Sequence, residues 1–250
     1  MSSAAYWADR YENSPTDKYN TSWPDRGMRA LELFEIYRYL TTSCFPNARI
    51  LELGCGMFTL DEFSEVVRVL EEIRGLRYLG LDSSHEALMV AEAALDNTMI
   101  RGEVEQCDIT DGVRMKKIYE DFRPTHILSR RVIQNLEPAE QLRLVAGIPD
   151  HCRGIFLEGT MRGAIGLDTY RHSCGLPPLP RPSFNWPLDR NVTEIFDDRG
   201  FRTEYPFSQY YRFTRCHPPH MYVGQARAEL GIIMSLQRYS LPAGEAVIHK

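Results

Sequence analysis

Residues 50–60 read ILELGCGMFTL, an apolar run that ends in Glu52 and enters a turn containing Gly54 and Gly56. A strand that runs into a glycine turn is typical of nucleotide sites, because glycine lets the backbone approach a ligand closely. The dinucleotide fingerprint GxGxxG needs a third glycine, and this sequence has Thr59 at that position. The charge of Glu52 would also oppose a diphosphate. A cofactor with a cationic centre and no phosphate therefore fits this stretch better.

Outward from this turn, short apolar runs alternate with amphipathic stretches. Strand-like runs lie at 49–53, 77–82, 100–108, 125–131 and 153–159. Between them, stretches with apolar residues at helical spacing lie at 60–74, 85–95, 112–122 and 138–148. This alternation predicts an α/β fold, with a doubly wound, mostly parallel sheet covered by helices on both faces.

The two ends of the chain break this rhythm. Residues 1–45 are rich in tyrosine and tryptophan, and we expect a helical lid there, in front of a single domain at 46–250. Residues 160–190 are rich in proline, glycine and arginine, which predicts an ordered loop insertion above the strand ends. The strand-like segments 201–215 and 230–240 are expected to add antiparallel strands and bring the sheet to seven.

Composition narrows the class of protein. The chain has 250 residues, 43% hydrophobic and 25% charged, and no apolar run approaches the roughly 18 residues of a membrane span. Six cysteines lie scattered without a CxxC pair and no secretory signal is recognised, so we expect reduced thiols in a cytoplasmic protein. A net charge of −5 argues against a broad basic face for nucleic acid. The expected partner is a small molecule, and the sequence leaves room for a homodimer.

Over about residues 49–160, the chain resembles class I S-adenosylmethionine-dependent methyltransferases, which have a Rossmann-like fold. The first motif of that family, (E/D)xGxG, is matched by Glu52, Gly54, Cys55 and Gly56. Many relatives carry another glycine after it, where this chain reads MFTL at 57–60. The resemblance implies S-adenosylmethionine as cofactor and S-adenosylhomocysteine as product.

The second and third motifs of the family are also present, in the same order. Asp82 ends the second strand-like run and is followed by Ser83, and the resemblance implies that the Asp82 carboxylate accepts hydrogen bonds from the ribose hydroxyls. Asp108 follows the third run, and its side chain and the Ile109 N–H are implied to meet the adenine. Arg130 and Ser83 complete the expected cofactor residues within the sheet.

The N-terminal segment is similar to the lead segment of many small-molecule methyltransferases. In those enzymes tyrosine and tryptophan side chains close over the cofactor, which implies such a role for Tyr11. An anchoring role, in which Tyr6, Trp7 and Tyr11 hold a terminal helix to the core, is equally compatible with the sequence.

Catalytic chemistry in a doubly wound sheet is expected beyond the carboxyl ends of the strands. Glu158, at the end of the fifth run, is the first candidate for a general base, and an acid held by Arg130 or Arg131 is the alternative reading of that residue. His172 is a second candidate base, with a surface histidine as its alternative, and Arg131 is the third candidate catalytic residue. The expected substrate-binding residues are Arg131, Asn135, Thr160, Arg171, Asn185, Tyr210 and Tyr211.

Several arginines fall in segments expected at the mouth of the site, in an otherwise acidic chain, and guanidinium groups suit carboxylate or phosphate. We therefore expect methylation of an oxygen or nitrogen of a small anionic metabolite, in biosynthesis. CHPPH at 216–220 is predicted as a loop, and no metal is predicted. The alternatives are a nucleic-acid or protein methyltransferase, a non-catalytic cofactor-binding relative, an NAD enzyme and an aminopropyltransferase-like protein.

Overall fold

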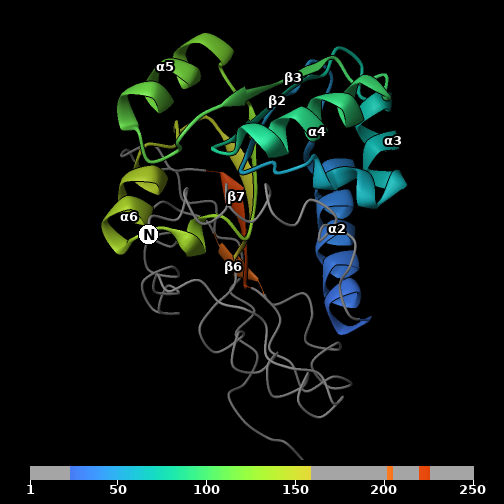
Figure 1. Ribbon diagram of the computed structural model, residues 1–250, viewed down its shortest axis with the longest axis horizontal. Coiled ribbons are helices and arrows are strands. Elements are labelled where there is room, and N and C mark those ends of the chain that lie inside the picture. Colours follow the sequence, from blue (N-terminus) through green and yellow to red (C-terminus); the bar gives the residue numbers. More distant parts are fainter. Residues whose placement is uncertain (1–22, 159–201, 205–219, 226–250) are drawn as a thin grey trace, which may run out of the picture.

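A computed structural model describes residues 23–158, 202–204 and 220–225 of the chain, and its centre is one seven-stranded sheet (Figure 1). The order of the strands across the sheet is β3-β2-β1-β4-β5-β7-β6. Their bounds are β1 Arg49–Leu53, β2 Arg77–Asp82, β3 Gly102–Gln106, β4 His126–Arg130, β5 Arg153–Glu158, β6 Arg202–Glu204 and β7 His220–Gln225.

The first five strands are all parallel, whereas β7 runs antiparallel to both β5 and β6. The strand order reverses at β1, which pairs with β2 on one side and β4 on the other. In open parallel sheets a ligand crevice forms at such a reversal, beyond the carboxyl ends of the strands. The predicted doubly wound sheet with antiparallel additions is confirmed, and it places the glycine turn after β1 at this point.

Helices cover both faces of the sheet. Their bounds are α2 Trp23–Ser43, α3 Ser64–Glu72, α4 His85–Asp96, α5 Gly112–Phe122 and α6 Pro138–Ala146. Figure 1 shows α2, α3 and α4 on one side and α5 and α6 on the other. Because side chains alternate along a strand, Ile50 and Tyr78 pack in the core beneath α2, α3 and α4, while Leu51 and Leu79 pack in the core beneath α5 and α6.

Two elements differ from the sequence prediction. The helix expected over 60–74 is divided into a 3₁₀ turn, η2 Thr59–Glu62, and α3, because Phe63 between them has an extended backbone with φ −132° and ψ 99°. The last strand, β7, begins at His220 within a segment predicted as loop, whereas β6 lies inside the predicted strand at 201–215. The predicted strand at 230–240 lies outside the described residues.

At one end of the sheet, β3 is a polar strand. Glu103 is exposed, and Glu105 forms an ion pair with Arg114 of α5. Charged side chains are characteristic of edge strands, where they oppose pairing with another chain. The sequence GEVEQ therefore suits the position at which the sheet ends.

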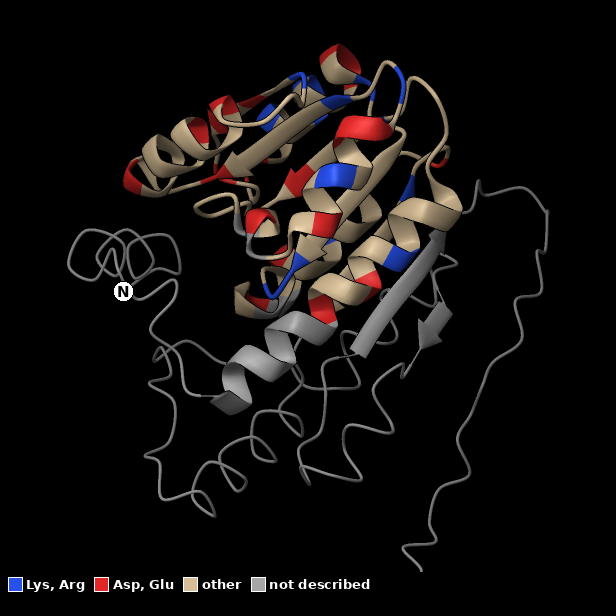
Figure 2. Cartoon of the chain, turned by 90° about the vertical axis from the view of Figure 1, so that its right-hand side faces the viewer, with Lys and Arg blue, Asp and Glu red and all other residues tan. Residues whose placement is uncertain are grey.

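The distribution of charge, the lengths of the helices and the grouping of possible metal ligands can each indicate what a protein binds. In the view of Figure 2, Lys and Arg positions are interspersed with Asp and Glu over the helices and turns. Within 23–158, 202–204 and 220–225, no helix is both long and apolar enough to cross a membrane. Nor do three or more His, Cys, Asp or Glu side chains of that part of the chain gather in a group that could hold a metal ion.

Candidate functional site

The glycine turn after β1 has a backbone geometry that favours glycine. Gly54 and Gly56 have φ values of +63° and +54°, in the left-handed region. A Cβ atom on Gly54 would lie 2.3 Å from Cγ2 of Val132, in the segment that follows β4. The turn therefore brings the carboxyl ends of β1 and β4 into direct contact.

Phe58 continues the alternate spacing of the two glycines and shares their left-handed backbone, with φ 58° and ψ 58°. This conformation costs a residue with a side chain about 1–2 kcal/mol. The ring is completely buried and meets the ring of Tyr78 edge to face, with centroids 5.4 Å apart. Burial of a phenylalanine contributes about 1.5–3 kcal/mol, which offsets the backbone cost. The departure from the family's glycine pattern at 57–60 thus preserves a glycine-like backbone.

Glu52 is a buried carboxylate at the base of this turn. Its Oε2 accepts a hydrogen bond of 2.5 Å from the hydroxyl of Tyr78, in β2. Burial raises the pKa of Glu52 to about 7, against the opposing effects of the Tyr78 hydrogen bond and the Arg130 charge, and the Asp82 charge raises it further. The carboxyl group therefore changes its charge near neutral pH.

Gly80 of β2 makes room for the groups beside Glu52. A Cβ there would lie 2.9 Å from both the Cys55 Sγ and the Tyr78 hydroxyl oxygen. The Cys55 thiol is fully buried, and burial raises its pKa well above the usual value. The Cys55 N–H donates to the carbonyl of Leu81 at 2.9 Å, which continues the pairing of β1 with β2 into the turn.

Asp82 ties the end of β2 to the glycine turn. Its Oδ2 accepts from the Gly56 N–H and its Oδ1 from the Ser84 N–H, both at 2.9 Å. Burial raises the pKa of Asp82, although these backbone hydrogen bonds act in the opposite direction. Ser83 provides a third backbone hydrogen bond. A carboxylate has about four acceptor sites, so these contacts leave capacity for a further donor.

Between Asp82 and α4, the two serines have different contacts. The Ser84 hydroxyl accepts from the Ala87 N–H at 3.2 Å and caps α4. The Ser83 carbonyl accepts from the Gln106 side-chain amide at 3.0 Å. This contact joins the ends of β2 and β3.

Asp108 lies two residues beyond β3, next in the row of strand ends. Its Oδ1 accepts from both the N–H and the hydroxyl of Thr110, at 2.9 and 2.8 Å. The N–H of Cys107 donates to the carbonyl of Asp82 at 2.9 Å, which fixes this loop against β2. Asp108 itself is exposed, while Ile109 is buried in the core beneath α5 and α6. The three predicted acids thus stand at the ends of three adjacent strands.

Arg130 and Arg131, at the end of β4, both meet a residue that the sequence prediction missed. Glu32 of α2 is completely buried. Its Oε1 lies 2.7 Å from Nε and 2.6 Å from Nη2 of Arg131, and its Oε2 lies 3.7 Å from Nη1 of Arg130. An acid that pairs with these arginines thus comes from α2.

A sequence signal for Glu32 does exist. Counting along α2, Glu32 precedes Ile36 by four positions and Tyr39 by seven, and all three are buried. An acid on the apolar stripe of a helix needs a partner, because a buried charge is costly unless it is paired. Which partner it meets cannot be read from the helix alone.

The backbone of Arg131 is held from two sides. It has φ +58°, its N–H donates to the carbonyl of Leu157 at 2.7 Å, and its carbonyl accepts from the Asn135 amide at 2.7 Å. Residues other than glycine persist in this conformation where the surroundings over-determine it, and such residues cluster at functional sites. The expected contact of Asn135 with substrate stays a prediction, since its amide nitrogen serves Arg131.

Glu158 is the last residue of β5, where its backbone pairs with that of His220 in β7. This register places it beside the end of β4, as predicted; its side chain is not described. Seven other predicted site residues lie outside the described residues, namely Tyr11, Thr160, Arg171, His172, Asn185, Tyr210 and Tyr211.

No family model and no curated protein matches this sequence. Solved structures do match. Magnesium protoporphyrin IX methyltransferase from Synechocystis PCC 6803, with bound S-adenosylhomocysteine, superposes with a TM-score of 0.61 at 14% identity, over 90% of this chain and 99% of that one. An S-adenosylmethionine-dependent methyltransferase from Anabaena variabilis superposes with a TM-score of 0.60 at 16% identity, over 91% and 96%.

A more distant match is phosphoethanolamine N-methyltransferase 2 from Haemonchus contortus, in complex with S-adenosylmethionine. Its TM-score is 0.50 at 13% identity, over 79% of this chain and 52% of that one. At these identities the likeness establishes the fold. The chain has the fold of class I S-adenosylmethionine-dependent methyltransferases, as its motifs predicted.

Proposed function

We propose that this protein transfers a methyl group from S-adenosylmethionine to an oxygen or nitrogen of a small anionic metabolite. The observation that carries the proposal is the joined set of motifs at the strand reversal. The Gly56 N–H bonded to Asp82 holds the turn after β1 against the end of β2, with Glu52 buried beneath it. Solved methyltransferases of the same fold bind S-adenosylmethionine or its product.

The donors and acceptors of this site suit that cofactor. The remaining acceptor capacity of Asp82 fits a ribose hydroxyl, and Asp108 with the Ile109 N–H fits the edge of an adenine. Ionised Glu52 favours the cationic methionine end of the cofactor over a diphosphate. When bound, S-adenosylmethionine supplies a methyl group on a sulfonium, which is already activated for displacement.

The task left to this chain is alignment and exclusion of water. The end of β4 brings Arg131, whose side chain is 33% exposed, to the edge where substrate would lie. A guanidinium group binds carboxylate or phosphate through paired hydrogen bonds, so we assign the anionic group of the substrate to Arg131. Glu158, at the adjacent end of β5, is the proposed base for a hydroxyl nucleophile, worth about 10²–10⁴-fold in rate.

Other features support a small substrate in a reducing setting. The interspersed charges of Figure 2 do not form a broad basic face on the side shown, as nucleic-acid binding would favour. Cys44, Cys55, Cys107 and Cys152 are free thiols, in keeping with the cytoplasm.

Calorimetric titration with S-adenosylmethionine and S-adenosylhomocysteine tests the cofactor assignment, and NADH is the matched control ligand. We expect heat from the first two and none from NADH. Formation of S-adenosylhomocysteine is then followed with a panel of small carboxylic and phosphate acids beside their uncharged esters. Turnover of acids only supports the full proposal. Binding without turnover of any acid, ester, oligonucleotide or peptide would indicate a non-catalytic relative instead.

A further inference from the structure

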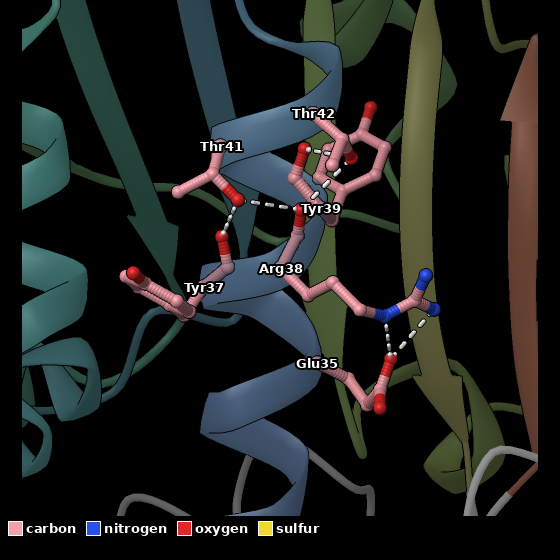
Figure 3. A network of polar contacts seen from close by, with 6 residues as sticks. All are labelled: Glu35, Tyr37, Arg38, Tyr39, Thr41 and Thr42. Carbon is pink, nitrogen blue, oxygen red and sulfur yellow. Dashed lines mark hydrogen bonds and ion pairs between the residues drawn. The ribbon is translucent and has the colours of Figure 1, made fainter.

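Two buried acids one turn apart on α2 are paired in different ways. Glu35 pairs within its own helix, where its Oε2 lies 2.7 Å from both Nε and Nη2 of Arg38 (Figure 3). Glu32 instead pairs with Arg131, which is 99 positions away in the sequence, and lies near Arg130. The Glu35 pair needs only the helix, whereas the Glu32 pairs exist only when α2 is docked on the end of β4.

Both oxygens of Glu32 are directed at the arginines. Oε1 accepts from two nitrogens on one side of the Arg131 guanidinium, which fixes the plane of that group as well as its position. Oε2 has no hydrogen bond among the described residues and lies 3.7 Å from Arg130. The attraction within a buried ion pair offsets the cost of removing its charges from water only where the geometry of the pair is good.

Arg131 is held by three different elements. Its N–H is bound by β5, through the carbonyl of Leu157, and its own carbonyl is bound by Asn135 of η3 (Ile133–Asn135). The third contact is the ion pair with Glu32 of α2, whose carboxylate binds the guanidinium group from its buried side. The Arg131 side chain nevertheless remains one-third exposed, compared with 10% for Arg130.

We propose that Glu32 is a positioning residue, which fixes the guanidinium of Arg131 in the orientation that receives the anionic group of the substrate. The inference rests on the proposed function for the identity of that group. Its physical basis is preorganisation: an arginine already held in its binding rotamer loses less side-chain entropy when a carboxylate or phosphate binds. The N-terminal helix then belongs to the substrate side of the site as well as to the core.

The first test needs no substrate. Phenylglyoxal modifies exposed guanidinium groups, and its reaction at Arg131 can be followed by mass spectrometry of the peptide, with saturating S-adenosylhomocysteine. In Glu32→Gln the charge-assisted contact is lost, so we expect Arg131 to react about fivefold faster. The matched control is Glu35→Gln, which removes an equally paired acid from the same helix and should accelerate modification of Arg38 while leaving Arg131 at the wild-type rate.

An unchanged rate at Arg131 in folded Glu32→Gln, or an equal rise in Glu35→Gln, would overturn the proposal. Glu32→Asp retains the charge and provides a second variant should the glutamine variant not fold. We expect the shorter carboxylate of Glu32→Asp to restore part of the protection of Arg131. A rate equal to that of wild type in Glu32→Asp, together with an unfolded Glu32→Gln, would assign Glu32 a role in folding only.

The second test uses any acid that the wild type turns over. Glu32→Gln should raise the KM for that acid about tenfold while the dissociation constant of S-adenosylhomocysteine changes less than about twofold. Equal changes in both constants would contradict a positioning role. Should the wild type turn over no acid, the proposed function fails at that point, and the phenylglyoxal rates still decide whether Glu32 positions Arg131.

Discussion

The carboxyl and amino ends of the strands, called here the carboxyl edge and the amino edge of the sheet, differ in the partners of their buried polar groups. At the carboxyl ends of the strands, buried carboxyl groups lie near charged groups: Glu32 pairs with Arg131, and Glu52 lies near Asp82 and Arg130. At the amino ends, the buried ring of His126 meets the hydroxyl of Thr125 at 2.8 Å and the carbonyl of Ser43 at 3.1 Å. The hydrogen-bond partners of His126 are thus neutral, with the charge of Arg153 nearby, whereas Glu32 is paired with a charged side chain.

From this difference we expect the amino edge to contribute mainly to the stability of the fold and the carboxyl edge mainly to ligand binding. A group with neutral partners gains little from a change of charge, so its edge is suited to holding helices and strands together. Where charged groups lie close together, a charged ligand changes their electrostatic interactions and their pKa values when it binds. Substitutions of polar side chains at the amino edge should therefore alter the free energy of unfolding, and substitutions of polar side chains at the carboxyl edge should alter ligand affinity.

The largest effect is expected where the carboxyl edge depends on shape as well as charge. Gly54→Ala places a side chain in a left-handed backbone and against Val132, which should cost about 2–5 kcal/mol of stability from backbone conformation and overpacking together. Urea denaturation measures this loss in the free energy of unfolding. The control is Gly112→Ala at the start of α5, where an added Cβ meets no atom within 4 Å. A loss of similar size in both variants would show that helix and turn glycines are equivalent here.

The next effect concerns ligand affinity at that edge. Asp82→Asn weakens the acceptors for the ribose and for the Gly56 N–H, so we expect the dissociation constant of S-adenosylhomocysteine to rise about 10–100-fold, equivalent to about 1.5–3 kcal/mol. Calorimetry provides the measurement. Asp96→Asn, at the exposed end of α4, is the matched control and should bind like wild type. If Asp82→Asn bound S-adenosylhomocysteine as tightly as wild type, Asp82 would not be part of the binding site.

A smaller effect should follow pH. Since burial raises the pKa of Glu52 to about 7, this carboxyl gains a proton as the pH falls from about 8 to about 6. The loss of negative charge opposes a cationic ligand, so the dissociation constant of S-adenosylmethionine should rise about tenfold over that range. The neutral thioether S-adenosylhomocysteine should show a smaller rise, and Glu52→Gln a flat profile. Parallel profiles for wild type and Glu52→Gln would refute this assignment of the charge.

The smallest effect belongs to the amino edge. Burial lowers the pKa of His126, the Arg153 charge lowers it further, and the hydrogen bond to Ser43 opposes both. The unfolded chain therefore takes up a proton first as the pH falls through about 6.5, and stability decreases below that value. Between about pH 7.5 and 5.5, wild type should lose about 1 kcal/mol more than His126→Gln in urea denaturation.

Affinity for S-adenosylhomocysteine should meanwhile be the same in wild type and His126→Gln at neutral pH. A large loss of affinity in this variant would break the division between the two edges.

Local patterns predicted one part of this site and could not predict the other. The turn at Gly54 and Gly56, with Asp82 and Asp108 on the following strands, depends on residues whose spacing follows from the length of one helix and one strand. The pairing of Glu32 with Arg131 depends instead on how a distant helix docks, which the periodicity of α2 does not specify. Sequence reasoning therefore found the arginines but did not find Glu32 as their partner.

Phe58 and β7 illustrate two further limits. A phenylalanine in a left-handed backbone contradicts its local preference, and only its burial against Tyr78 stabilises that conformation. The first residue of β7, His220, falls in the segment 216–220 that its two prolines indicated as a loop, while the pairing with β5 across the sheet makes it part of a strand. In both cases a tertiary contact prevails over the local signal.

The polar strand at the outer margin of the sheet bears on how copies of this protein can assemble. Two molecules that joined β3 to β3 would bring the exposed carboxylate of Glu103 towards its counterpart, and like charges across adjoining strands repel. Sheet continuation through β3 is thereby disfavoured. The same repulsion protects the protein from fibrillar growth along this margin.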